Sequence, residues 1–336
     1  MSTASTLLSP SQLALVRERS DLRGISVVAH AWIVIFGSMA VVAAFPNPVT
    51  YIAAIAIIGA RQLGLAILMH DGAHGILTRN LRLNNFLSQW LCAYPMLAET
   101  GAYRRYHLKH HAHTQQPEDP DLILSAPFPI TRKSFRRKMI RDLTGQTGYQ
   151  QRKAQIANAW GRGDLSLARH VAHYWQKLGR ATAFQLGLFA LLALAGHWTF
   201  FFTLWLLPML TWQQAITRIR NIAEHAMVDA NDPFRNARTT QANFLERVFI
   251  APYWVNYHVE HHLMMWVPCY NLPMARRFLI ANGYGERIES KPGYVSVLRM
   301  ATSKPDDQDR PGELVHNARR RVVGNFNEGF SKPDAA

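Results

Sequence analysis

The chain has 336 residues, of which 49% are hydrophobic and only 18% are charged, so its apolar content exceeds what one soluble core requires. Its formal net charge of +15 would suit nucleic acid, but the basic residues leave two long stretches empty. That distribution favours a membrane protein and predicts no nucleic-acid partner. The two cysteines, Cys92 and Cys269, cannot form a disulfide framework and are expected to be buried thiols.

The N-terminal residues 1–24 are polar and lack the pattern of a cleaved signal peptide, so we expect an N-terminal cytoplasmic segment. Residues 24–60 contain no Asp, Glu, Lys or Arg, a run of 37 residues. Because about 20 residues cross a bilayer once, this run predicts a hairpin of two helices. Its turn is expected at Phe45–Pro48, with spans near 25–45 and 49–69.

The segment between the two uncharged runs is mixed in character. Phe86–Ala98 is apolar but too short to span, which predicts a re-entrant or interfacial helix. In residues 135–141, basic side chains are interspersed with apolar ones. They predict either a helix lying on anionic lipid or a solvated basic helix.

A second uncharged run of 37 residues covers 181–217. We expect a second hairpin here, with spans near 181–196 and 198–217 and the turn at Gly196–His197. The final segment, 301–336, is rich in Asp, Pro, Gly and Arg and is expected to be poorly ordered.

The distribution of Lys and Arg predicts the topology, since cytoplasmic segments collect positive charge. Three basic residues precede Gly24, 17 lie between Gly75 and Arg180, 16 follow Thr217, and Arg61 completes the total of 37, so neither predicted turn carries one. The fold class is therefore all-α and polytopic, with four transmembrane helices in two hairpins and a cytoplasmic helical cap. Both termini are expected in the cytoplasm, and a bacterial inner membrane is the expected location.

Histidines at helical spacing form three clusters outside the predicted spans, one HxxxH and two HxxHH. Residues three and four apart share a helix face, so each cluster directs its imidazoles toward one region. A fourth element, Asn221–His225, has the same i, i+4 spacing and leads from the last span toward the third cluster. The nine histidines are His70, His74, His107, His110, His111, His225, His258, His261 and His262.

Nine imidazoles exceed the needs of one ion, which predicts a two-metal centre. Structural zinc takes four ligands and catalytic zinc three plus water, and His70-Asp71 does not match the HExxH motif of metalloproteases. A pair of irons that activates dioxygen fits such an all-nitrogen site best. Nearby carboxylates are expected to fix the imidazole tautomers, namely Asp71, Glu99, Glu118, Asp119, Asp121 and Glu224.

Three stretches resemble the membrane fatty acid desaturase family, whose hallmark is this order of histidine boxes over four membrane helices. They are His70–Gly75, Arg104–Thr114 followed by Glu118–Asp121, and Asn256–Leu263 followed by Val267–Pro273. The resemblance runs from about residue 25 to 300, which we take as the membrane domain. It implies that the nine histidines hold two iron ions and that Asn221 approaches one of them through water.

By this resemblance the chain is expected to desaturate a fatty acyl chain of a lipid, using dioxygen and external electrons. Hydroxylation or ring ketolation of a lipid or carotenoid is the alternative, because the same boxes serve both reactions. A metal or haem transporter is a remote alternative. The ligands of a transporter would lie near the bilayer midplane, whereas the histidines of this chain are expected at the ends of the spans. The chain has no haem, iron–sulfur or nucleotide-binding motif, so a separate ferredoxin-like or cytochrome b5-type electron donor is expected.

Overall fold

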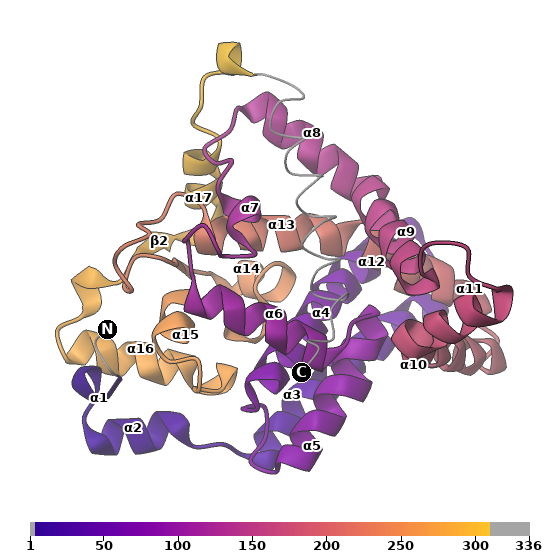
Figure 1. Cartoon of the computed structure of the whole chain (residues 1–336), viewed down its shortest axis with the longest axis horizontal. Coiled ribbons are helices and arrows are strands. Elements are labelled where there is room, and N and C mark those ends of the chain that lie inside the picture. The colour runs from indigo at the N-terminus through magenta and orange to yellow at the C-terminus, as the bar shows by residue number, and fades with distance from the viewer. Residues whose placement is uncertain (1–3, 310–336) are drawn as a thin grey trace.

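The structure is a computed structural model that describes residues 4–309. Helices make up most of the chain, as predicted (Figure 1). Within the described range, three helices are long and apolar enough to cross a membrane: Asp21–Ala44 (α3), Pro48–His74 (α4) and Leu167–Leu194 (α10). Most of the segment expected to be poorly ordered, residues 310–336, lies outside the described residues.

The first hairpin consists of α3 and α4, which turn at the expected Phe45–Pro48. The Asn47 side chain caps α4 by accepting hydrogen bonds from the backbone N–H groups of Val49 and Thr50. Gly75, with φ +73°, ends the helix in the left-handed conformation that favours glycine. The 27 residues of α4 extend for about 40 Å, which is longer than the roughly 30 Å thickness of a hydrocarbon core, so a helix that crosses it would have turns to spare at its end.

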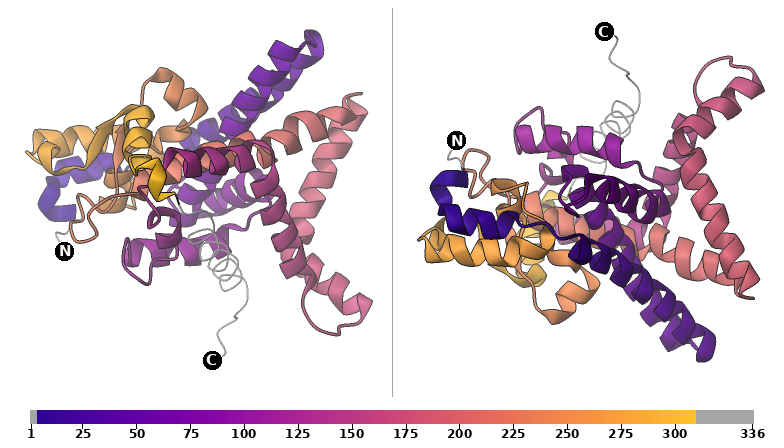
Figure 2. Two further views of the ribbon diagram at one scale, coloured as in Figure 1. Left: turned by 90° about the horizontal axis from the view of Figure 1, so that it is seen from above. Right: turned by 90° about the horizontal axis from the view of Figure 1, so that it is seen from below.

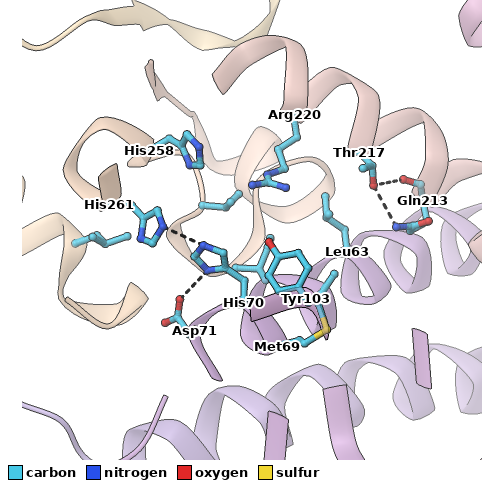
Figure 3. Close-up of a pocket in the computed structure, with 14 residues that line it drawn as sticks. Leu63, Met69, His70, Asp71, Tyr103, Gln213, Thr217, Arg220, His258 and His261 are labelled. Atoms are coloured by element: carbon cyan, nitrogen blue, oxygen red, sulfur yellow. Dashed lines mark hydrogen bonds and ion pairs between the residues drawn. The ribbon is translucent and has the colours of Figure 1, made fainter. Parts of the chain in front are cut away.

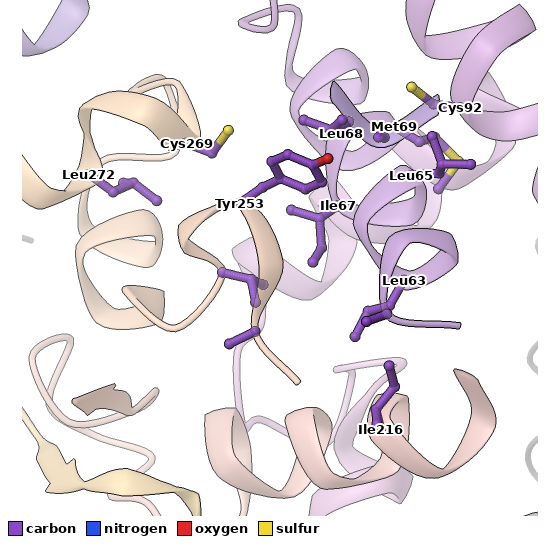
Figure 4. Packing of buried hydrophobic residues seen from close by; sticks show 14 of the residues in the cluster. Leu63, Leu65, Ile67, Leu68, Met69, Cys92, Ile216, Tyr253, Cys269 and Leu272 are labelled. Carbon is purple, nitrogen blue, oxygen red and sulfur yellow. The ribbon is translucent and has the colours of Figure 1, made fainter. Parts of the chain in front are cut away.

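Helix α4 lies at the centre of the hydrophobic core. Its side chains Leu63, Ile67 and Leu68 pack among residues that come from distant parts of the sequence, including Ile216 and Leu272 (Figure 4). These five side chains are almost fully buried. The central position of α4 explains why the histidines at its end can meet histidines from three other helices.

The segment between the hairpins contains no helix long enough to span. The apolar stretch predicted to be re-entrant folds into a π-helix and a short 3₁₀ turn against α4. The basic stretch lies within helix α8. The elements are α5 (Leu81–Phe86), η1 (Leu87–Ala93), η2 (Tyr94–Met96), α6 (Thr100–Ala112), α7 (Leu122–Ser125), α8 (Arg132–Leu143) and α9 (Gln146–Trp160).

The second hairpin turns at Gly196–His197, and its return limb is irregular. The predicted span near 198–217 is divided into Trp198–Phe200 (α11), the π-helix Phe201–Leu206 (η3) and Leu207–Leu210 (α12). Pro208 lacks the N–H that a regular helix needs, and the backbone breaks at Thr211 with φ −119° and ψ −88°. No single helix in the described chain therefore forms the fourth span.

The C-terminal third carries short elements on the side of the histidines, and the two strands pair in parallel with Thr239 beside Ser290. Its last described residue, Asp309, forms an ion pair with Arg137 of α8. The elements are α13 (Trp212–His225), β1 (Thr239–Gln241), α14 (Phe244–Phe249), η4 (Pro252–Trp254), α15 (His258–Leu263), η5 (Cys269–Asn271), α16 (Leu272–Ala281), η6 (Gly285–Arg287), β2 (Ser290–Pro292), α17 (Gly293–Ala301) and η7 (Asp306–Gln308).

The two hairpins project from one end of the molecule, and both of their turns lie far from the C-terminal helices (Figure 2). The N-terminal helices, Ala4–Leu7 (α1) and Pro10–Arg17 (α2), lie beside α16 at the opposite end (Figure 1). Asn282 fixes this contact by donating a 2.8 Å hydrogen bond to the carbonyl of Leu7. The arrangement separates an apolar part from a helical cap that contains most of the polar chemistry.

Candidate metal centre

The first pair of histidines lies on the last turn of α4. His70 and His74 are one turn apart, and their ring centroids are separated by 4.8 Å. Gly72 between them faces Ser88 of η1, where a Cβ atom would lie only 2.1 Å from the Ser88 Cβ. The glycine in this box therefore allows η1 to pack directly against the turn that carries both imidazoles.

The second box lies on α6, whose first turn is capped by Glu99. The Glu99 carboxylate accepts a hydrogen bond from the backbone N–H of Gly101 at 3.1 Å and another from Ala102. Glu99 therefore holds the helix and not an imidazole, contrary to its predicted tautomer role. The cap still contributes to the site, because it fixes the start of the helix that carries His107, His110 and His111.

The third box lies on the short helix α15, next to β1. Glu260, within the box, is completely buried and accepts hydrogen bonds from Arg276 at 2.6 Å and from the hydroxyl of Thr239. His225, at the end of α13, completes the set, and its Nε2 lies 2.8 Å from the Nε2 of His258. A helix of six residues is held in place by these contacts with the sheet and α16.

All nine predicted histidines converge, and they do so in two separate groups. Within each group the ligand atoms lie within 4.8 Å of one another. The first group contains His70, His74, His107, His111 and His261. The second contains His110, His225, His258 and His262.

Each HxxHH box contributes to both groups, and the division follows helix geometry. In the second box the i, i+4 pair His107 and His111 enters the first group, whereas His110 enters the second. In the third box the pair His258 and His262 enters the second group, whereas His261 crosses to the first. The two boxes therefore divide in opposite senses and produce two adjacent groups, and the rings of His111 in the first group and His262 in the second are 4.4 Å apart.

Several imidazoles are oriented by a hydrogen-bond partner at Nδ1, which leaves Nε2 facing the group. His110 Nδ1 lies 2.8 Å from a carboxylate oxygen of Asp119, and His70 Nδ1 lies 3.3 Å from Asp71. His225 uses the backbone carbonyl of Asn236. Metal-binding histidines are commonly held in this way, since an acceptor at one nitrogen fixes the lone pair on the other.

Four of the six predicted carboxylates lie within 4.0 Å of an imidazole nitrogen, whereas Glu99 and Glu118 do not. Asp71 and Asp119 act on imidazole nitrogens, as expected. Asp121 lies 3.8 Å from the His110 Nδ1 and also accepts the hydroxyl of Tyr106. Glu224 lies 3.5 Å from the His258 Nε2 and pairs with Arg220, whereas Glu118 is exposed. Sequence spacing alone does not distinguish these carboxylates, because the loop after α6 determines which of them turns inward.

Burial keeps most of the imidazoles outside the spans neutral. It lowers the pKa values of His107 and His258 well below the usual range for histidine, and neighbouring histidines lower them further. At His110 burial acts in the same direction, but the hydrogen bond to Asp119 and nearby carboxylates outweigh it, so the pKa of His110 is raised. Neutral imidazoles are the form that binds metal.

The arrangement fits metal ions better than a hydrogen-bond network. Nε2 atoms of different histidines face one another at 2.8–3.4 Å, although a neutral imidazole offers only one donor and one acceptor. The Nε2 of His74 is buried and has no protein hydrogen-bond partner. Two cations, one at each group, would satisfy these convergent lone pairs.

The remaining predicted ligand, Asn221, is half-buried on α13, one helical turn before His225. His113 ends α6 and belongs to neither group. His30 contacts the hydroxyl of Tyr253, while His170 and His173 contact backbone carbonyls. Both cysteines are buried thiols, as expected.

A cavity of about 120 Å³ opens beside both groups (Figure 3). Its walls include His70 and His261 of the first group and His258 of the second. Tyr103 and Arg220 also line it, and the sequence interpretation assigned neither a role in the site. The only sequence signal for Arg220 is its i, i+4 spacing to Glu224, with which it pairs at 2.6 Å.

The fold and the site together define a helical protein with apolar hairpins and a nine-histidine centre suited to two metal ions. A family model described as fatty acid desaturase matches residues 46–288, which is more than half of the chain. The chain is also 28% identical over 257 residues to a dihydrorhizobitoxine desaturase of Bradyrhizobium elkanii, covering 74% of this chain and 70% of the relative. The chain belongs to the fatty acid desaturase family and is an oxidoreductase of the desaturase type.

Proposed function

We propose that this chain is a membrane-bound di-iron oxidoreductase that uses dioxygen and external electrons to desaturate an aliphatic chain, a lipid acyl chain being the first expectation. The observation that carries the proposal is the convergence of nine histidines into groups of five and four. The two iron ions would supply dioxygen activation and removal of hydrogen from an unactivated C–H bond. Asn221 would approach the second ion through water.

The residues of the chain hold and orient this centre. Asp71 ties two parts of it together, because its carboxylate contacts His70 and also accepts a 2.7 Å hydrogen bond from the backbone N–H of Cys269. Buried apolar side chains of α4, such as Leu63 and Ile67, form one wall of the adjacent cavity and exclude water from it. Exclusion of water and fixed positioning are what a protein contributes to an oxygen-activating cofactor.

The proposed topology places both termini and the histidine centre on the cytoplasmic side of an inner membrane. We take the irregular limb of α11, η3 and α12, continued by the first turns of α13, as the fourth crossing, because it returns beside α10 and residues 198–217 are uncharged. With only three crossings, α15 would be separated by the bilayer from α4. Such a separation is incompatible with a group that contains both His70 and His261.

Metal analysis and product analysis test the proposal together. Purified protein is expected to contain close to two irons per chain. Membranes from cells that express the protein should convert a saturated chain into an alkene. An alcohol as the main product would favour the hydroxylase alternative. Stoichiometric zinc with little iron would overturn the di-iron assignment.

A matched pair of variants connects the activity with the site. His261→Ala should abolish turnover and lower the iron content, because His261 is the third-box ligand of the first group. His113→Ala, on a half-buried histidine outside both groups, should retain both. Equal iron content in the two variants would contradict the assignment of His261 as a ligand.

A further inference from the structure

The polar wall of the cavity contains a feature that an apolar chain alone would not require. Arg220 lies on the α13 face that also carries Gln213 and Thr217 toward the cavity (Figure 3). Gln213 and Thr217 are hydrogen-bonded to each other at 3.1 Å. Arg220 uses only its Nε atom, which donates to Glu224 at 2.6 Å.

The rest of the guanidinium is available to a ligand. Among residues 4–309, neither Nη atom of Arg220 has a hydrogen-bond partner, and neither atom is fully buried. The hydroxyl of Tyr103 lies on the same wall, points toward Arg220 and likewise has no partner within the described chain (Figure 3). This part of the cavity therefore offers several N–H donors and one O–H donor close together.

The chemistry of these donors selects a carboxylate. Two Nη atoms of one guanidinium match the two oxygens of a carboxylate in a planar, bidentate pair, and the Tyr103 hydroxyl can donate a further hydrogen bond. Asp71, the one carboxylate among the cavity residues, already engages His70 and the backbone of Cys269. Nothing on the wall competes for the free edge of Arg220.

The volume of the cavity limits the distance between the bound carboxylate and the carbon that reacts. A cavity of about 150 Å³ holds benzene, and this one measures about 120 Å³. It is bounded by Arg220 on one side and by histidines of both metal groups on another, with Leu63, Ile67 and Leu272 forming apolar walls. Only a few heavy atoms fit between the guanidinium and the metal centre.

We propose that the substrate is a free aliphatic carboxylate, bound through Arg220 and Tyr103, whose reacting carbons lie only a few bonds from the carboxyl group. This inference rests on the proposed function for the identity of the reaction, but not for the binding of the acid. The apolar remainder of the acid lies against α4 and can leave through the open side of the cavity. An acyl group esterified in a phospholipid lacks the charge that Arg220 would pair with.

The test measures binding separately from turnover. Hexanoate and methyl hexanoate are titrated into the detergent-purified protein by isothermal calorimetry, and the same two compounds are then supplied to the enzyme with reductant and dioxygen. Wild-type protein is expected to bind the acid at least tenfold more tightly than the ester. Equal affinity for the two, or turnover restricted to phospholipid acyl chains, would overturn the proposal.

Three substitutions locate the binding. Arg220→Lys should weaken hexanoate binding by roughly tenfold through loss of the bidentate pair, and Tyr103→Phe should weaken it less while leaving the ester unaffected. Arg218→Lys is the matched control, because Arg218 is on the same helix but pairs with Asp142 at 2.5–2.8 Å. An Arg220→Lys protein with unchanged preference for the acid would refute the assignment, as would a loss of preference in Arg218→Lys.

Acid binding and turnover can each fail without the other, so the carboxylate site and the di-iron function are tested separately. Acid binding that depends on Arg220 in a protein without iron or turnover would support this site and refute the di-iron function. Turnover of long lipid chains with no affinity for the acid would support the function and refute the carboxylate site.

Discussion

At the scale of single residues, the site depends on which nitrogen of each histidine faces inward. Asp119 is almost fully buried and accepts the Nδ1–H of His110, so the Nε2 of His110 points to the second group. The same carboxylate accepts backbone N–H groups from Gln115 and Asp121, each at 2.8 Å. One side chain therefore fixes both the loop after α6 and the orientation of an imidazole.

Asp119→Asn should reduce metal affinity at the second group by about 10-fold to 100-fold. The amide retains one acceptor oxygen but loses the charge, and its NH₂ group cannot accept the loop N–H groups. Competition with a chelator, followed by elemental analysis, measures the change. Glu118→Gln, at the exposed neighbouring position, should match the wild type. Equal chelator sensitivity of the two variants would show that Asp119 does not support the ligand.

At the scale of elements, the first histidine box also acts as a packing motif. Gly72 lets the π-helix η1 approach the last turn of α4, and the Asn84 side chain donates a 2.9 Å hydrogen bond to the Gly72 carbonyl. The two functions of the box are inseparable, because the turn that carries His70 and His74 is the one against which η1 packs. A larger residue at position 72 would displace the imidazoles on either side.

Gly72→Ala is expected to destabilise the protein by about 1–3 kcal/mol, because its Cβ would overlap the Ser88 side chain. Thermal unfolding in detergent gives the measurement. Gly37→Ala on α3 is a suitable control, since a Cβ there meets no atom within 4 Å. The double variant Gly72→Ala/Ser88→Gly should regain part of the stability that Gly72→Ala loses. A Gly72→Ala protein as stable as Gly37→Ala would mean that the contact is looser than described.

At the scale of the whole molecule, the proposed topology places the two hairpin turns on one side of the membrane and the cap on the other. The hairpin turns carry no Lys or Arg, whereas the segment between the hairpins carries 17. The basic helix α8 is part of that segment. Its Asp142 pairs with Arg218 of α13, and its Arg137 pairs with Asp309. The cap therefore carries both the histidine groups and most of the positive charge.

Labelling of single cysteines tests the topology. Cysteines introduced at positions 47 and 197 should react with an impermeant reagent added from outside, and a cysteine at 137 should not. Cys92 and Cys269 are buried and should give little background. Reaction at 137 from outside would refute the two-hairpin arrangement. Position 310, which the same topology places inside, lies beyond the described residues.

The electron supply is also a property of the whole molecule. The strongly basic cap should attract a small acidic carrier, so washed membranes are expected to lose activity and to regain it when a reduced ferredoxin or cytochrome b5-type protein is added. The initial rate should fall as salt rises, because screening weakens the encounter. Turnover by purified protein with NADH alone would contradict the need for a separate carrier.

The sequence by itself determined the helical, membrane-type composition, the turns at Phe45–Pro48 and Gly196–His197, and the nine histidines that converge. These features are local: uncharged runs, turn residues and i, i+4 spacing act within a few residues of one another. For the same reason, the family resemblance could be recognised from three short motifs.

Only the tertiary structure decided how the histidines divide, which carboxylates support them and what surrounds the cavity. His107 and His110 are three residues apart yet belong to different groups, because α15 presents His261 to one side and His258 to the other. Asp119 turns inward while Glu118 remains exposed, and Arg220 reaches the cavity from a distant helix. These outcomes depend on how helices pack across long separations in the chain, which the spacing of residues along one helix does not specify.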